Sequence, residues 1–258
     1  MCFNKEWSLG FTLSSISLGI WVLTGKSLWS SLDPWRRRRI SYCFFYFALM
    51  EGLQFFQYLV INQCDTTINI ILTALGWVHI CWQPLFSNFA FSALDPKNQK
   101  KERDETWKFV LKMCFASGLF MALRIAIPAF TQMSEESFLF KPCASEIEGV
   151  CGQKTCTENG IYHLKWTFKM LKPSYVFPSI SAHFLFMFVA PFLLGLQLQS
   201  IILFMTGPAI ALLFTKATDG ERASIWCFFS IAESFITIIA AYMACRKQLK
   251  ANDKKKDE

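Results

Sequence analysis

Residues 68–94, INIILTALGWVHICWQPLFSNFAFSAL, decide the class of this protein, because this apolar stretch contains no Asp, Glu, Lys or Arg. A helix needs roughly 20 mainly apolar residues to cross the hydrocarbon core of a bilayer, and this stretch exceeds that length. Inside the core, each backbone N–H and C=O group must bond within its own helix. The stretch therefore predicts a membrane-spanning helix.

Stretches of the same kind fill most of the chain. The 258 residues are 53% hydrophobic and only 17% charged, whereas a soluble domain carries nearer about 25% charged residues. We predict an all-α fold, a polytopic membrane bundle of about seven transmembrane helices with a cysteine-rich outer loop. The predicted spans are residues 8–24, 40–61, 68–94, 109–127, 180–198, 200–214 and 224–244. The fifth and sixth are so close that one broken re-entrant hairpin is an alternative.

The basic residues alternate between the two sides of the predicted bundle, as the positive-inside rule expects. The loops after the first and third spans and the C-terminal tail carry most of them. This pattern predicts an outer N-terminus, a transmembrane domain over residues 1–245 and a basic cytosolic tail over residues 246–258. Topology accounts for the net charge of +7, so the lipid bilayer is the expected partner and nucleic acid is not.

The last four residues of the tail are KKDE, with Lys256 third and Lys255 fourth from the end. They resemble the dilysine retrieval signal of endoplasmic-reticulum membrane proteins, an address that a receptor reads. We therefore expect the endoplasmic reticulum in a eukaryote, and the plasma or inner membrane otherwise. The alternative is an ordinary lysine-rich tail.

Residues 128–179 form the only long connection between predicted spans. A loop of this length in a compact protein is usually functional or disordered, and its cysteines and aromatic residues lead us to expect an ordered outer cap. Four cysteines fall on the predicted non-cytosolic side, where an oxidising compartment allows disulfides. They are Cys64, Cys143, Cys151 and Cys156.

Four cysteines allow three pairings. The pairing we favour is Cys151–Cys156 with Cys64–Cys143, because it would staple the cap to the bundle. A zinc ion held by Cys151, Cys156 and His163 is the competing interpretation, although their spacing matches known zinc patterns poorly. We therefore predict disulfides, and neither a metal nor another cofactor.

Two ionisable residues are predicted at the same depth in the membrane. Glu51 lies about 11 residues from the inner end of its span and His79 about 11 residues from the outer end of the next, so both are about 16 Å deep. The short connection makes these helices antiparallel neighbours, so the two side chains can face each other. Glu233 reaches a similar depth in the last span. A group this deep costs several kcal/mol and is functional by default.

Other polar residues extend this pair. The candidate ligand or proton site consists of polar side chains within the predicted spans: Glu51, Gln54, His79, Gln83, Asn88 and Glu233. Pro84 and Pro208 are expected to loosen their helices. Together with these polar residues they predict a polar or wet cavity between the second, third, sixth and seventh spans. The structural alternative is that these side chains only bond helix to helix, for about 0.6 kcal/mol each.

Short motifs follow one another along nearly the whole chain. They are MCF at 1–3, LMEGLQ at 49–54, GWVHI at 76–80, Gln83-Pro84, Asn88, and the outer-loop residues Cys151-Gly152, Cys156, Gly160, His163 and Trp166. Their order and spacing resemble an uncharacterised family of small multi-pass membrane proteins, a domain of unknown function found in bacteria and some eukaryotes. The resemblance supports the candidate site, does not include Glu233, and implies no activity.

Three functions fit these observations. The preferred hypothesis is binding or transport of a small solute or a lipid, with Glu51 and His79 as a proton-linked pair and the outer cap as a gate. The second is an intramembrane enzyme that acts on a lipid with one of these two residues as general base. The third is a receptor or assembly factor that binds a partner through the outer cap. The sequence predicts no particular oligomeric state.

Overall fold

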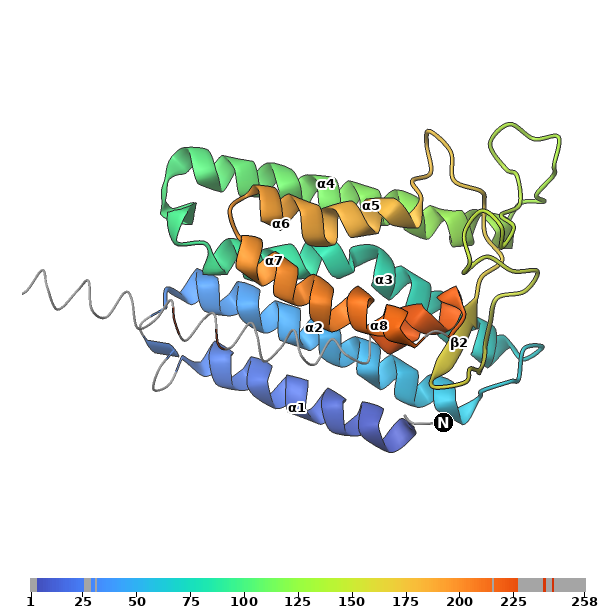
Figure 1. Cartoon of the computed structure of the whole chain (residues 1–258), viewed down its shortest axis with the longest axis horizontal. Coiled ribbons are helices and arrows are strands. Elements are labelled where there is room, and N and C mark those ends of the chain that lie inside the picture. Colours follow the sequence, from blue (N-terminus) through green and yellow to red (C-terminus); the bar gives the residue numbers. More distant parts are fainter. Residues whose placement is uncertain are drawn as a thin grey trace, which may run out of the picture.

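The computed structural model describes residues 4–25, 29–30, 32–214, 216–226, 239 and 243. This part of the chain is mostly helical, and four long helices pack side by side (Figure 1). They are α1 (Lys5–Thr24), α2 (Pro34–Leu59), α3 (Thr67–Leu94) and α4 (Lys101–Ala126). Short 3₁₀ turns, η2 (Pro96–Gln99) and η3 (Ile127–Ala129), precede and follow α4.

Local sequence signals set the helix ends. The side chain of Asn4 accepts a hydrogen bond from Trp7 N at the start of α1, and Thr66 accepts one from Asn69 N at the start of α3. These side chains satisfy N–H groups that have no partner inside the helix. Pro34 opens α2, and Gly25 closes α1 with a φ of 66°, which glycine adopts without strain.

Three described helices are long and apolar enough to cross a membrane by length and composition. They are Lys5–Thr24, Thr67–Leu94 and the continuous segment Lys101–Ala129. α2 is not among them, and its first turns carry the four arginines 36–39. The seventh predicted span, residues 224–244, lies outside the described residues except at its edges, as does the basic tail 246–258.

The predicted fifth and sixth spans form two short antiparallel rods, which turn at Gly195 (Figure 1). Each rod is an α-helix interrupted by one turn of π-helix. Such turns are rare in proteins, and those that occur are often found at functional sites. The first comprises α5 (Ile180–Phe184), η4 (Leu185–Val189) and α6 (Ala190–Leu193). The second comprises α7 (Gln197–Phe204), η5 (Met205–Ala209) and α8 (Ile210–Leu213). The described helices thus include three of membrane-spanning length and two shorter apolar rods.

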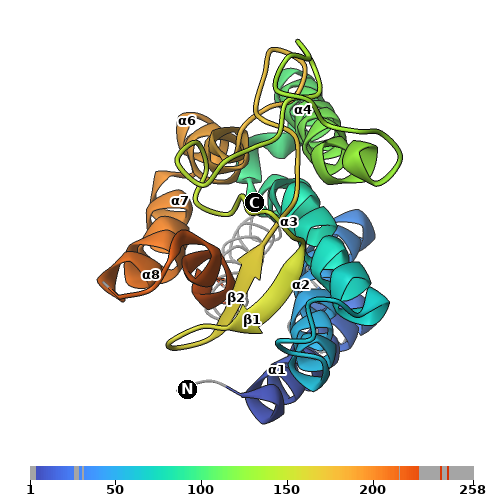
Figure 2. The same ribbon diagram turned by 90° about the vertical axis from the view of Figure 1, so that its right-hand side faces the viewer.

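Residues 128–179 form an ordered cap that contains a small antiparallel sheet, so the described chain is mostly α-helical with one β-hairpin. β1 (Cys156–Asn159) pairs with β2 (Leu164–Thr167), with Cys156 opposite Thr167. Viewed from the cap end, α1–α4 form a curved row, the rods α5–α8 lie across from it, and the β1–β2 hairpin lies between the two groups (Figure 2).

Aromatic packing joins the cap to the bundle. Trp77 of α3 and Trp166 and Phe168 of the cap are each fully buried in one hydrophobic cluster. The ring centroids of Trp77 and Phe168 are 5.0 Å apart, and the indole N–H of Trp77 donates to Met121 O of α4. Burying side chains of this size contributes several kcal/mol, so the cap folds as part of the bundle.

Candidate functional site

One disulfide joins the cap to the α2–α3 connection and the other lies within the cap, and their pairing corrects the one that we favoured. All four predicted cysteines are bonded, but as Cys64–Cys156 and Cys143–Cys151. The predicted pairs Cys151–Cys156 and Cys64–Cys143 do not form. Sequence proximity suggested the short pair, whereas the fold decides which cysteines meet.

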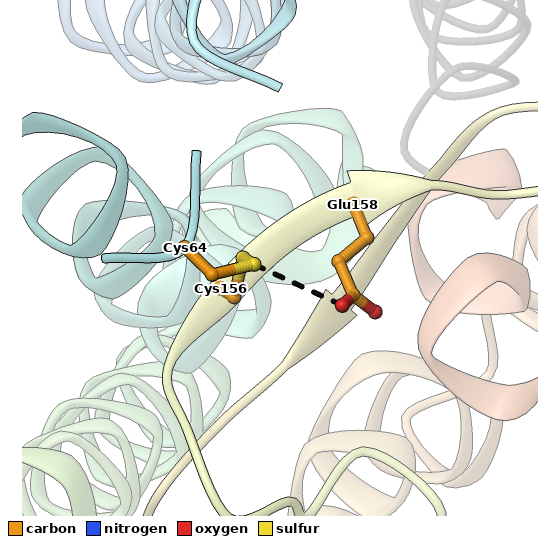
Figure 3. A group of neighbouring side chains, drawn as sticks. All are labelled: Cys64, Cys156 and Glu158. Carbon is orange, nitrogen blue, oxygen red and sulfur yellow. Dashed lines mark hydrogen bonds between the residues drawn. A yellow bond between two sulfur atoms is a disulfide. The ribbon is translucent and has the colours of Figure 1, made fainter. Parts of the chain in front are cut away.

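The reason lies in how β1 docks. Strand β1 runs along the connection between α2 and α3, where Asn62 N donates to Thr157 O and Asn159 N donates to the Asn62 side chain. This places Cys156 beside Cys64 (Figure 3). Cys151 lies on the other side of the 152–155 turn, where it forms a β-bridge with Phe168.

The competing zinc arrangement is not formed either. Cys151 and Cys156 belong to different disulfides, so their sulfurs are not available as thiolates. Glu158 lies next to the Cys64–Cys156 disulfide, with 3.8 Å between its Oε1 and Cys64 Sγ (Figure 3). Both ring nitrogens of His163 have protein partners of their own.

His163 links the cap to α2. Its side chain is fully buried, Nδ1 lies 2.5 Å from the Tyr58 hydroxyl, and Nε2 lies 3.1 Å from Gln54 Oε1. Its backbone N–H donates to Glu221 Oε1. Burial lowers the pKa of His163 to about 3. The imidazole is therefore neutral at physiological pH, and Gln54 is a predicted site residue that the cap reaches directly.

Glu51 and His79 do not pair. Glu51 is buried on the α1 side of α2, where the Ser8 hydroxyl is the polar group that acts on its carboxyl. His79 of α3 has its Nε2 atom 2.7 Å from Tyr46 O and stacks on the Tyr46 ring at 3.9 Å. The predicted depth brings both residues to the bundle interior, but the rotation of each helix gives them different neighbours.

A second polar group surrounds Gln83, and the sequence analysis missed one of its members. Gln83 Oε1 lies 3.2 Å from Nε2 of His183, which is 2% exposed and has its ring edge-to-face with Trp226 at 5.1 Å. The available signal was that the chain has three His residues and that His183, like His79, falls within a predicted apolar span.

The π-helical turn η4 explains why the polar side chain of Asn88 is buried in the bundle. Its amide donates to Pro84 O within α3 and to Phe186 O in η4, at 2.7 and 2.8 Å. A π-helical turn leaves carbonyl groups without the hydrogen bonds of a regular α-helix, and a buried amide can donate to them. Asn88 thus bonds α3 to the first rod. The remaining predicted site residue, Glu233, lies outside the described residues.

A cavity of about 640 Å³ opens between the cap, the two rods and the helical residues 219–226. Apolar side chains form most of its wall, with Val150 from the cap, Ile180 from α5, Ala211 from α8 and Trp226. Through Trp226 the cavity adjoins His183 and the Gln83 group.

Charged residues lie at one side of this cavity. Arg222 donates to Asp219 at 2.9 Å, and both line the wall. Glu148 also lines it, and forms a buried ion pair with Arg124 at 2.5 Å. Arg124 points into the protein, where Leu171 O and Pro178 O also accept its N–H groups. An apolar wall with a few charged groups on one side can hold an amphipathic molecule.

The comparisons give a family but no activity. The family model described as a family of unknown function (DUF5765) matches residues 17–250. No curated protein and no solved structure matches the chain.

Proposed function

We propose that this chain, which belongs to that family of unknown function, is a multi-pass membrane protein that binds a lipid-like, amphipathic molecule in the cavity between its cap and its two rods. The cavity is the observation that carries this proposal. Its volume of about 640 Å³ lies within the range typical of small-molecule sites, about 300–1,000 Å³.

The walls support an apolar ligand that arrives from the bilayer. Leu212 lines the cavity and is 57% exposed, so the cavity reaches the outer surface of the α8 rod. The adjacent Leu213 is 76% exposed on the same rod. A surface of this kind is favourable in contact with acyl chains, and the Asp219–Arg222 pair would meet the polar end of the ligand.

The proposed orientation places the cap on the non-cytosolic side. Two disulfides in the cap agree with an oxidising compartment, and three helices have the length of a membrane span. Residence in the endoplasmic reticulum is a separate prediction from Lys255 and Lys256. In a eukaryotic cell, replacing both by serine should release a tagged protein to later compartments, and unchanged retention would contradict the dilysine interpretation.

The test uses full-length protein in lipid nanodiscs and a photoactivatable fatty-acyl probe. The wild type should be labelled at peptides that line the cavity. Ala211→Phe puts a ring into the cavity wall and should lower labelling at least about tenfold, which corresponds to about 1.4 kcal/mol. Leu213→Phe adds the same ring to an exposed neighbour outside the lining and should keep wild-type labelling.

Labelling that both variants retain would refute binding in this cavity. Labelling that both lose equally would indicate non-specific contact with the rod surface. If Ala211→Phe does not accumulate, Leu212→Asn provides a second test, because it makes the wall polar without adding volume and should weaken the same labelling.

Partner binding through the cap remains a second candidate, and it has its own observation. Phe138 and Tyr175 lie on the cap loops, where Phe138 is 83% exposed and Tyr175 is fully exposed. Exposed aromatic residues are enriched where proteins meet partners or membrane interfaces. Cross-linking from these two positions in cells should recover one recurrent protein if the cap is a docking site, and only lipid if it is not.

A further inference from the structure

A separate group of buried polar atoms lies between α1 and α2. Ser8 and Gln54 are fully buried, and Glu51 is 2% exposed. Within the described part of the chain, the Ser8 hydroxyl, both Glu51 carboxylate oxygens and the Gln54 amide nitrogen have no hydrogen bond of normal geometry. Glu51 and Gln54 are three residues apart and share a helix face, and Ser8 acts on the Glu51 carboxyl from α1.

This arrangement is costly without an occupant. Buried polar groups are almost always hydrogen-bonded, and each exception calls for an ordered water, an ion or a function. A carboxylate is the most expensive of these groups to bury. No Lys or Arg within the described residues forms an ion pair with Glu51.

We propose that Ser8, Glu51 and Gln54 form a binding site for a small monovalent cation of the Na⁺ class. The two carboxylate oxygens and the Ser8 hydroxyl oxygen supply the hard oxygen ligands that such ions prefer. A single carboxylate balances a single positive charge. A divalent ion would leave a net charge buried in the bundle, which is unfavourable.

Gln54 provides a fourth oxygen and connects the site to the cap. The oxygen and nitrogen of an amide exchange places by rotation, and the tautomer of a histidine follows its partners. In one arrangement His163 Nε2–H donates to Gln54 Oε1, as the 3.1 Å contact allows, and the amide nitrogen has no partner within the described residues. In the other arrangement the amide donates to His163 Nε2, and its oxygen faces the cation.

The second arrangement moves the imidazole proton to Nδ1, from which it donates to the Tyr58 oxygen 2.5 Å away. Cation binding therefore selects one tautomer of a residue in the cap. Ser8 is three residues inside the start of α1, about 4.5 Å along the helix axis. The site thus lies one turn below the end of α1 that is nearest the cap, and we assign access to that side.

The experiment measures thermal unfolding of the full-length protein in detergent, at one pH and one ionic strength, in NaCl or choline chloride. Above the concentration that half-saturates the site, each tenfold increase in Na⁺ concentration should raise the unfolding midpoint temperature of the wild type by about 3–6 °C. Glu51→Gln should abolish this dependence. Glu6→Gln is the matched control, because Glu6 lies on α1 with its side chain 67% exposed and should keep the full dependence.

Equal midpoints in NaCl and choline chloride would overturn the proposal. A midpoint that changes with pH but not with Na⁺ would also overturn it, because the carboxyl would then carry only a proton. If Glu51→Gln does not fold, the cation site is tested instead with Ser8→Ala and by direct binding of radioactive Na⁺ to the wild type. Ser8→Ala should shift half-saturation to higher Na⁺, and absence of binding to the wild type would refute the site.

Discussion

The ion pair between Arg124 and Glu148 gives the sharpest test of how the cap is held to the bundle. The Arg124 side chain is fully buried and that of Glu148 is 5% exposed, with 2.5 Å between Nη2 and Oε2. The other Glu148 oxygen accepts the backbone N–H of Ile180 at 2.8 Å, at the start of α5. One carboxylate thus connects α4, the cap and the first rod.

Glu148→Ala removes this carboxylate and leaves a buried guanidinium without its counter-charge. Breaking a buried pair in this way costs about 3–5 kcal/mol. Two carbonyl groups still accept from Arg124, so we expect the lower part of that range, about 3 kcal/mol. The double variant Arg124→Met with Glu148→Leu removes both charges, and should lie within about 1–2 kcal/mol of the wild type.

The assay is the free energy of unfolding by denaturant titration in mixed micelles, for Glu148→Ala, for the single variants Arg124→Met and Glu148→Leu, and for the double variant. A double-mutant cycle then gives the interaction energy of the pair, which we expect to exceed about 2 kcal/mol. Glu146→Ala is the control, because this exposed carboxylate lies two residues away and should change stability by no more than about 0.5 kcal/mol. A loss below about 1 kcal/mol for Glu148→Ala, with additive effects in the cycle, would refute a structural role for the pair.

Three further predictions concern the cap. Cys64→Ser should destabilise by about 2 kcal/mol more than Cys151→Ser in the same titration, because the first disulfide closes 92 residues and the second closes 8; equal losses would contradict this. As pH falls below the ordinary histidine pKa of 6.5, the free energy of unfolding of the wild type should fall by up to about 1.4 kcal/mol per pH unit relative to that of His163→Gln. The reason is that the imidazole binds a proton in the unfolded chain, whereas the buried imidazole, with a pKa of about 3, does not. Parallel pH profiles of the two proteins would contradict this. Asn69→Leu should cost about 1–3 kcal/mol and speed proteolysis of the cap, because its amide bonds both Val60 O and Thr157 O; an unchanged proteolysis rate would contradict it.

The long apolar helices were predictable because their signal is local. Residues 68–94 were predicted and α3 spans Thr67–Leu94, since an apolar run ends where a capping residue and a charge begin. The second helix was predicted to begin at residue 40, but it begins at Pro34. The arginine run was interpreted as a loop, whereas Arg36 is buried and donates to Ala93 O of α3.

The burial of the candidate site residues was predictable, and their contacts were not. Glu51, Gln54, His79, Gln83 and Asn88 are all buried, as their positions inside apolar helices implied. Their partners come from elsewhere in the chain, from α1, the cap and η4. No spacing rule connects these segments, because the contacts depend on how far each helix is rotated about its axis.

By itself, the sequence determined that the chain forms long apolar helices, which buried positions carry polar groups, and which four cysteines are bonded. Each of these properties follows from the composition of a short segment and its environment. Only the tertiary structure decided that Cys64 bonds to Cys156, that Glu51 turns to α1 while His79 turns to Tyr46, and that an apolar cavity opens beside the cap. These outcomes depend on long-range packing, in which a strand that docks on a helix end brings together residues nearly a hundred positions apart.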